Sequence, residues 1–427
     1  MITLPVITDP AQLAERLERR QRALDDTRAP VANILAQVRE QGDDALRRFT
    51  REFDGAEIDD VRVPQQMLEK SQAALPAELA DHIRAAIGNI RRFHELQLPA
   101  GFDYSQPDGT EVSWGWRSIE RVGIYVPGGR YPLVSSLVMN VIPAQVAGVR
   151  EIAVCSPPTS NGLPETAILG ICSMLGIEEV YRLGGAQAIA ALAYGTETVR
   201  AVDKITGPGN RYVTGAKQAV MDRVGIDMTA GPTEVVVLAD ESSDPRWAAA
   251  DLISQAEHDP LAWPVMVTTS RGLAEKVNEL LGSLLDSLPT RRTAEASLRN
   301  HGFIYLAENP DAGVEIVNRI APEHLCLQVA EPERLRDRCK AGVIFLGGHT
   351  PTAWGDYWAG PNHTLPTGGQ VRYRGPLSVL DFMTPSSVIQ AGPQAVRRSG
   401  SKVRALANLE GLAGHALSVA VREGEDA

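Results

Sequence analysis

The chain has 427 residues, more than one hydrophobic core usually organises, so two or more domains are expected. A formal net charge of -11 without a run of basic residues disfavours proteins that bind nucleic acid or anionic membrane surfaces. No signal peptide, long apolar stretch or CxxC pair is visible, so we expect a cytoplasmic protein without a membrane partner.

The first hundred residues carry helical periodicity. Charged amphipathic patterns over 11–26 and 31–49 predict helices, and a third such pattern covers 67–97. We expect residues 1–24 to form a small N-terminal helical segment.

Short β-rich runs begin near Arg121, and most are followed by a Gly-containing turn or a helical stretch. Two sets of strands are expected; they cover 122–126, 151–155, 179–183 and 203–206, then 234–240, 265–269, 302–307 and 342–347. This pattern predicts an α/β protein with two incomplete Rossmann-like parallel-sheet domains. After Thr364 the chain becomes rich in Gly, Pro and Arg before a last helix, which predicts a C-terminal tail that packs on another surface, often a second subunit.

Two polar pairs in the second set could carry chemistry. Gln255 and His258 are three residues apart in SQAEHD, and on a helix this spacing puts both side chains on one face. Asp356 and His363 fall in the turn-rich segment GDYWAGPNHTLPTGG. Taken alone, each pair is more typical of solvated surface residues than of a functional site.

Glu323 and His324 are adjacent in APEHL, where Pro322 predicts the start of a helix. Neighbouring side chains on a helix diverge by about 100°, so the two could address different atoms of one substrate, although such pairs are common on surfaces. Glu410 and His415 in EGLAGHA say almost nothing alone.

Three Gly-rich turns follow successive predicted strands: VPGG (126–129), LGGAQ (183–187) and GPGN (207–210). None matches the dinucleotide fingerprint GxGxxG or the P-loop, and ordinary turns would explain each singly. Their recurrence at one sheet edge favours a ligand site, because ligands bind at the carboxyl ends of parallel strands.

Taken in order, these segments resemble the histidinol dehydrogenase family from about Asp43 to about Arg422. The matching stretches are VGIYVPGGR, SSLVMNVIPAQVAGV, RLGGAQAIAALAYGTETV, VDKITGPGNRYVTGAKQAV, VGIDMTAGPTE, DLISQAEHD, IVNRIAPEHL, GDYWAGPNHTLPTGG and EGLAGHA. So many long motifs in one order make a chance match very improbable.

The resemblance implies one Zn²⁺ per subunit and the cofactor NAD. The family's zinc ligands fall on Gln255, His258, Asp356 and His415. Its catalytic pair falls on Glu323 and His324, and its NAD contacts fall on Tyr125, Gln187 and Asn210. Its substrate contacts fall on Thr233, Gln255, His258, His324, Asp356, Glu410 and His415. A zinc site without Cys ligands is typical of open catalytic sites.

The implied reaction is a two-step, NAD-linked oxidation of L-histidinol through L-histidinaldehyde to L-histidine, the last steps of histidine biosynthesis. His324, neutral near pH 7, would accept the alcohol proton, and Glu323 would activate water to attack the aldehyde. The resemblance also implies a homodimer with shared active sites. It places metal and catalytic residues in a domain of 25–122 and 235–375, NAD in 123–234, and the tail domain in 376–427.

The sequence leaves alternatives open. Thr233 stands where most relatives have Ser, and the stretches GGRYPLVSS and VRYRGPLSVLDFMTPSSV also depart from the usual pattern. Paralogues with the same machinery oxidise other polar alcohols such as a dihydroxypropane sulfonate, and Arg372 and Arg374 could serve an anionic substrate. A catalytically idle α/β protein is disfavoured, because every mapped residue is present.

Overall fold

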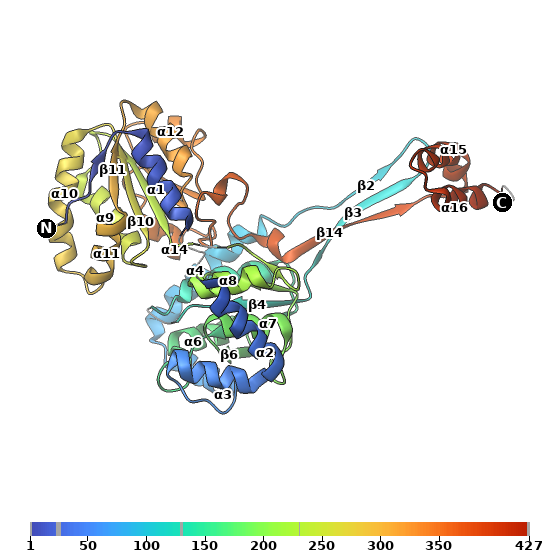
Figure 1. The fold of residues 1–427 in the computed structure, drawn as a ribbon, viewed down its shortest axis with the longest axis horizontal. Coiled ribbons are helices and arrows are strands. Elements are labelled where there is room, and N and C mark those ends of the chain that lie inside the picture. The colour runs from blue at the N-terminus through green and yellow to red at the C-terminus, as the bar shows by residue number, and fades with distance from the viewer. Residues whose placement is uncertain (1, 23–26, 129–130, 230, 425–427) are drawn as a thin grey trace.

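The computed structural model describes residues 2–22, 27–128, 131–229 and 231–424, and shows two α/β units and a long arm (Figure 1). Gly129 of the VPGG turn, Ala230 of the AGPTE stretch and the last residues of the expected 1–24 segment lie outside these described residues. Among the described residues, no helix combines the length and apolar character that crossing a membrane requires.

The first α/β unit is built on a parallel sheet, six-stranded within the described ranges, with the order β1-β11-β10-β9-β12-β13. Its strands are β1 (Val6–Ile7), β9 (Glu234–Ala239), β10 (Trp263–Thr268), β11 (Phe303–Leu306), β12 (His324–Gln328) and β13 (Val343–Leu346). The central strands are apolar on both faces, as a sheet covered on both sides requires.

Helices cover both faces of this sheet. One face packs on α9 (Pro245–Ala256), α10 (Arg271–Asp286) and α11 (Arg291–His301). The other packs on α1 (Pro10–Arg22), α12 (Pro310–Ile320) and α13 (Pro332–Arg336). Residues of β9 alternate between the two cores, because successive side chains of a strand point to opposite faces.

The second α/β unit has a parallel sheet that is five-stranded in the described chain, with the order β6-β5-β4-β7-β8. Its strands are β4 (Arg121–Tyr125), β5 (Glu151–Ser156), β6 (Glu179–Arg182), β7 (Lys204–Thr206) and β8 (Gly225–Ile226). The first strand lies at the centre and the chain winds outward in both directions, so the strand order reverses beside β4. This order is that of a Rossmann-like half and confirms the predicted fold class.

Unlike α1, the next three helices of the chain pack on this second sheet. One face is covered by α2 (Arg28–Phe49), α7 (Gly185–Tyr194) and α8 (Arg211–Ala219). The other is covered by α3 (Gln65–Ala73), α4 (Ala77–Glu95), α5 (Val134–Val146) and α6 (Thr166–Met174). We expected 25–122 to belong with 235–375, and these contacts differ from that expectation. Helical periodicity identifies an apolar face but not the sheet that the face will cover.

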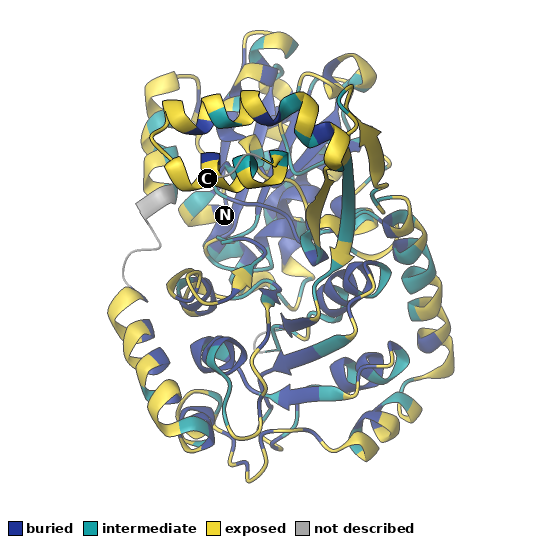
Figure 2. Ribbon diagram, turned by 90° about the vertical axis from the view of Figure 1, so that its right-hand side faces the viewer, coloured by how far each residue is buried: buried dark blue, intermediate teal, exposed yellow. Residues whose placement is uncertain are grey.

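The arm is a long antiparallel ribbon with a helical pair at its tip (Figure 1). Its elements are β2 (Phe102–Ser105), β3 (Glu111–Ser118), β14 (Met383–Gln390), α15 (Pro393–Leu409) and α16 (Ala413–Glu423). In the described part of α15 and α16 only Ala and Gly residues are buried, and Figure 2 shows the pair mostly exposed. Large apolar side chains are exposed along the arm, among them Phe102, Val388, Ile389, Leu406 and Leu409.

Gly207, which follows β7, supports a close approach of two strands. Its φ is +111°, and a Cβ at this position would overlap the carbonyl oxygen of Tyr125 at the end of β4. We expect Gly207→Ala to lower the free energy of unfolding by about 2 kcal/mol or more, because it adds both backbone strain and a clash. Thermal unfolding followed by circular dichroism measures this. Gly272→Ala in α10 is the control, since a Cβ there meets open space. Equal melting temperatures for the two variants would contradict the prediction.

Candidate active site

The amino ends of β9 and β12 form the centre of the candidate site. The two strands are hydrogen-bonded neighbours, and His324 lies opposite Val235. Glu234 begins β9 and His324 begins β12, so the catalytic candidates gather where these strands start. Ligands of parallel sheets usually bind at the opposite, carboxyl edge, which makes this placement unusual for the fold.

Glu323 and His324 do not begin a helix, and that prediction was wrong. The preceding helix α12 ends at Ala321, whose φ of +48° is left-handed. Pro322 therefore follows a helix end, a position where Pro is common, instead of opening a new helix. His324 enters the sheet as the first residue of β12, and both side chains are buried.

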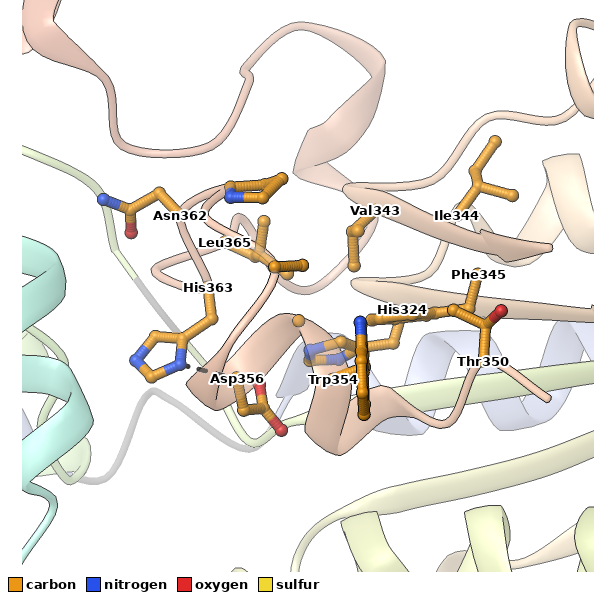
Figure 3. Close-up of a pocket in the computed structure, with 13 residues that line it drawn as sticks. His324, Val343, Ile344, Phe345, Thr350, Trp354, Asp356, Asn362, His363 and Leu365 are labelled. Carbon is orange, nitrogen blue, oxygen red and sulfur yellow. Dashed lines mark ion pairs between the residues drawn. The ribbon is translucent and has the colours of Figure 1, made fainter. Parts of the chain in front are cut away.

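Hydrogen bonds fix the orientation of His324. Its Nδ1 lies 3.0 Å from the carbonyl oxygen of Glu234, so this nitrogen carries the proton and donates. The ring stacks on Phe345 with centroids 6.1 Å apart. Nε2 is buried without a hydrogen-bond partner among the described residues, and the ring lines a cavity with Trp354, Asp356 and His363 (Figure 3).

Glu323 is held equally firmly. Its Oε2 accepts hydrogen bonds from the Thr233 hydroxyl at 2.5 Å and from the Glu234 backbone N–H at 2.9 Å. The same Oε2 lies 3.4 Å from Nδ1 of His324. Glu323, His324 and Thr233 are therefore brought together as the sequence predicted, although on strands.

The charge of Glu323 changes the protonation of His324. Burial alone would lower the pKa of His324, but the adjacent Glu323 carboxylate outweighs burial and raises that pKa to about 9, with a smaller contribution from Asp356. The imidazole by itself therefore favours the protonated form at pH 7, whereas we expected it to be neutral. A cation bound beside these carboxylates would oppose protonation.

The expected metal ligands Gln255, His258 and Asp356 come from two helices that meet at this edge. Gln255 lies in the last turn of α9, and His258 lies just beyond that helix, with its N–H 3.3 Å from the Gln255 carbonyl oxygen. Asp356 lies in the short helix α14 (Thr352–Tyr357), not in a loop as we expected. A hydrogen bond of 3.1 Å between Ser254 and Thr352 joins the two helices.

Asp356 is a carboxylate in a mostly buried position. Its Oδ1 lies 3.5 Å from Nδ1 of His363 (Figure 3). Burial alone would raise the pKa of Asp356, but His363 outweighs burial, with smaller effects of His324 and His258, so the pKa is below its usual value. The imidazoles around it thus keep this group ionised, the form in which a carboxylate binds a metal.

His415 and Glu410 are separated from these residues within one chain. Glu410 caps the C-terminal end of α15 and His415 lies in α16, both exposed at the tip of the arm. Among the residues that the structure describes, no three His, Cys, Asp or Glu side chains gather closely enough to hold a metal ion. Within one chain, His415 and Glu410 on the arm are therefore not part of the edge at which Gln255, His258 and Asp356 lie.

The predicted NAD contacts lie at the carboxyl edge of the five-stranded sheet. Tyr125 ends β4, and its hydroxyl accepts a hydrogen bond from the Gly185 N–H at 3.2 Å. Gln187 lies in the first turn of α7, buried, with no partner among the described residues for either amide atom. Asn210 caps α8, and its side-chain oxygen accepts from the N–H groups of Tyr212 and Val213.

Three further polar residues at this edge were missed by the sequence. Ser156 and Thr206 end β5 and β7, and their hydroxyls are buried without a partner in the described chain. Asp54 ends the π-helical turn η2 (Thr50–Asp54), and burial raises its pKa to about 6. Ser156 and Thr206 could have been found as polar residues that close predicted strands, whereas no pattern placed Asp54. Together with Gln187 these unpartnered groups fit a polar ligand such as a dinucleotide.

The model of the histidinol dehydrogenase family matches residues 17–423. The chain belongs to the histidinol dehydrogenase family. It is 48% identical over 393 residues to histidinol dehydrogenase of Halalkalibacterium halodurans, covering 92% of this chain and 93% of that protein. It is 47% identical to the Bacillus subtilis enzyme, covering 96% and 97%. A crystal structure of histidinol dehydrogenase from Elizabethkingia anophelis superposes with a TM-score of 0.93 at 34% identity, covering 99% and 98% of the two chains. Family membership makes the chain an NAD-dependent oxidoreductase.

Proposed function

We propose that this chain oxidises L-histidinol to L-histidine in two successive NAD-linked steps. One observation carries the proposal: the buried Glu323–His324 pair adjoins an edge where Gln255, His258 and Asp356 supply metal-binding groups. A base, a water-activating carboxylate and a metal-ligand set in one place suit oxidation of an alcohol through an aldehyde.

His324 serves as the base of the first step. Because Nδ1 donates to the Glu234 carbonyl oxygen, Nε2 is the nitrogen left to accept the alcohol proton, while the alcohol carbon transfers a hydride to NAD. The raised pKa means that the imidazole must lose its proton before it can act. The base is then regenerated for the second step.

Glu323 activates water in the second step. Thr233 and the Glu234 N–H hold its carboxylate, so it can take a proton from water as the oxygen adds to the aldehyde carbon. His324 then removes a proton from the hydrate, whose hydride would pass to a second NAD when that cofactor is bound. Burial keeps the reactive aldehyde away from bulk solvent.

We propose Gln255, His258, Asp356 and His415 as the ligands of one zinc ion. Amide, imidazole and carboxylate donors without thiolate fit an open catalytic site, and Asp356 is held ionised. When bound, zinc would supply a Lewis acid that anchors the amino and imidazole nitrogens of histidinol. The Thr233 hydroxyl, whose one proton is donated to Glu323, also lies 2.9 Å from the Gln255 amide oxygen and so places one of the proposed ligands beside the catalytic carboxylate.

The fourth zinc ligand requires a second copy of the chain in this proposal. Glu410 ends α15 and His415 lies in α16, the two helices at the tip of the arm (Figure 1). Several large apolar side chains of the arm are exposed. An exposed apolar arm is stabilised by burial against a partner, and reciprocal arms would complete both active sites of a homodimer. Glu410 would then meet the ammonium group of the substrate.

The sulfonate alternative loses its main support. Arg372 donates to the carbonyl oxygens of Gly369, Asn318 and Arg319, and Arg374 donates to that of Asp227. Both guanidinium groups are therefore engaged by the backbone. Tyr125, Gln187 and Asn210 remain the proposed NAD contacts. The cytoplasmic location remains a prediction, and it is consistent with four free cysteines.

The substrate assignment predicts two NADH for each L-histidinol consumed by the zinc-loaded protein. NADH absorbance and chromatography of the remaining histidinol measure the ratio. The same assay is run with simple amino alcohols and a dihydroxypropane sulfonate. If histidinol gives no NADH while the sulfonate does, the histidinol assignment is wrong and the chain oxidises the sulfonate.

The role of His324 predicts that His324→Ala loses about 10²-fold to 10⁴-fold in kcat, the usual contribution of a general base, while keeping one zinc per subunit. His258→Ala should lose zinc and activity together. Zinc is measured by mass spectrometry after gel filtration. Loss of zinc from His324→Ala would contradict its role as a base that does not bind the metal. Retention of zinc by His258→Ala would contradict its role as a ligand.

Shared active sites predict complementation between two inactive proteins. In a mixed dimer of His324→Ala and His415→Ala chains, one site combines an intact core with an intact arm. Random mixing after reversible unfolding should therefore restore about a quarter of wild-type activity, since half the dimers are mixed and each has one working site. Continued inactivity, with mixed dimers shown by two different tags, would place each site within one chain.

A further inference from the structure

The backbone of one residue, Glu234, binds both members of the catalytic pair. Its N–H donates to Glu323 Oε2 at 2.9 Å, and its carbonyl oxygen accepts from Nδ1 of His324 at 3.0 Å. A shift of the first residue of β9 would therefore move the carboxylate and the imidazole together. Nothing in the proposed mechanism uses the Glu234 side chain.

That side chain is a buried carboxyl group, which is costly unless it is paired. Its Oε1 lies 3.1 Å from Nη1 of Arg20 and accepts the Gly368 N–H at 2.9 Å, while Oε2 has no hydrogen-bond partner among the described residues. Burial raises the pKa of Glu234 to about 7, and Arg20 opposes that shift. An apolar residue at the first position of β9 would avoid the desolvation cost of a buried carboxylate. The presence of an ion pair there therefore suggests a role other than stability.

Arg20 reaches this carboxyl group from α1, on one face of the six-stranded sheet. Its guanidinium lies 5.5 Å from the centre of the Trp263 ring, and Nη2 donates to the Ile320 carbonyl oxygen at 3.2 Å. The side chain is 6% exposed. Arg20 thus ties the N-terminal helix, the end of α12 and the start of β9 into one rigid contact.

We propose that Arg20 and Glu234 are a positioning pair for the oxidation. The ion pair fixes the first residue of β9, whose N–H and carbonyl group hold Glu323 and His324 in their reactive orientation. Through Gly368 the same carboxylate also anchors the segment that follows His363. This inference rests on the proposed function, because it assigns Arg20 and Glu234 to the orientation of that catalytic pair. Small displacements of such groups lower turnover strongly.

Four variants test the pair in the zinc-loaded full-length protein: Arg20→Met, Arg20→Lys, Glu234→Gln and the double variant Arg20→Met/Glu234→Gln. We expect Arg20→Met to lose about 10-fold in kcat, with KM for histidinol and for NAD within about 2-fold of wild type. Arg20→Lys keeps the charge and should recover most of the loss. The double variant should have a higher kcat than Arg20→Met, because the neutral amide introduced by Glu234→Gln needs no cation beside it.

Arg16→Met is the matched control, one turn earlier on α1. Arg16 lies over the Phe303 ring with 4.8 Å to its centre, so its loss weakens the packing of the same helix. We expect it to lower the melting temperature about as much as Arg20→Met while keeping wild-type kcat. Zinc content should be one per subunit in every variant.

Wild-type kcat in Arg20→Met would overturn the proposal, and so would equal kcat losses in Arg16→Met and Arg20→Met. If Arg20→Met fails to fold, kcat of Glu234→Gln decides, and an unchanged value overturns the inference. The wild-type assay tests the proposed function separately. If the wild-type protein oxidises a different alcohol, the variants are compared with that alcohol as substrate. The kcat values of Arg20→Met and Arg16→Met then decide the positioning role independently of the substrate assignment.

Discussion

The hydrogen bond from His324 Nδ1 to the carbonyl oxygen of Glu234 is the contact on which the catalytic geometry depends. It exists because β9 and β12 are parallel neighbours whose first residues lie side by side. It leaves Nε2 as the only nitrogen of the ring that can serve as a base. The first residue of β9 also provides the N–H that holds Glu323, so the sheet itself orients both of the proposed catalytic groups.

The site combines opposite edges of two similar sheets. The proposed catalytic residues lie at the amino edge of the six-stranded sheet, whereas the groups proposed for NAD lie at the carboxyl edge of the five-stranded sheet. The segment after Gly360 joins the units: Asn362 donates to the Met139 carbonyl oxygen at 2.6 Å, and Asn140 donates to Thr364 at 3.3 Å. Asn362 also lines the cavity beside His324, so this joint between the two units lies at the candidate site.

The sequence was sufficient for the strands and the class of fold, because alternating βα periodicity is a local signal. It failed where the outcome depends on distant contacts. We predicted a helix at Glu323 and His324 because we took Pro322 as a helix start. The left-handed conformation of Ala321, which ends α12, has no signature in the sequence. The roles of Arg20 and Glu234 were invisible for the same reason, since the ion pair joins residues more than two hundred positions apart. Family resemblance supplied the proposed ligand set and implied shared active sites, and the structure adds that His415 lies in α16 at the tip of the arm (Figure 1).

The arm explains why the chemistry and the assembly belong together in the proposed function. An antiparallel ribbon with few buried side chains gains little hydrophobic stabilisation from its own chain, so its exposed Ile389, Leu406 and Leu409 represent stabilisation still available to a partner. Two polar residues lie beside them, Glu410 at the C-terminal end of α15 and His415 in α16. If the apolar contacts seat the arm, then the same association that buries them delivers a carboxylate and an imidazole to the metal edge. Zinc binding and dimerisation would then be thermodynamically linked. Each association of two chains would both bury apolar surface and complete a coordination sphere, so each process would strengthen the other.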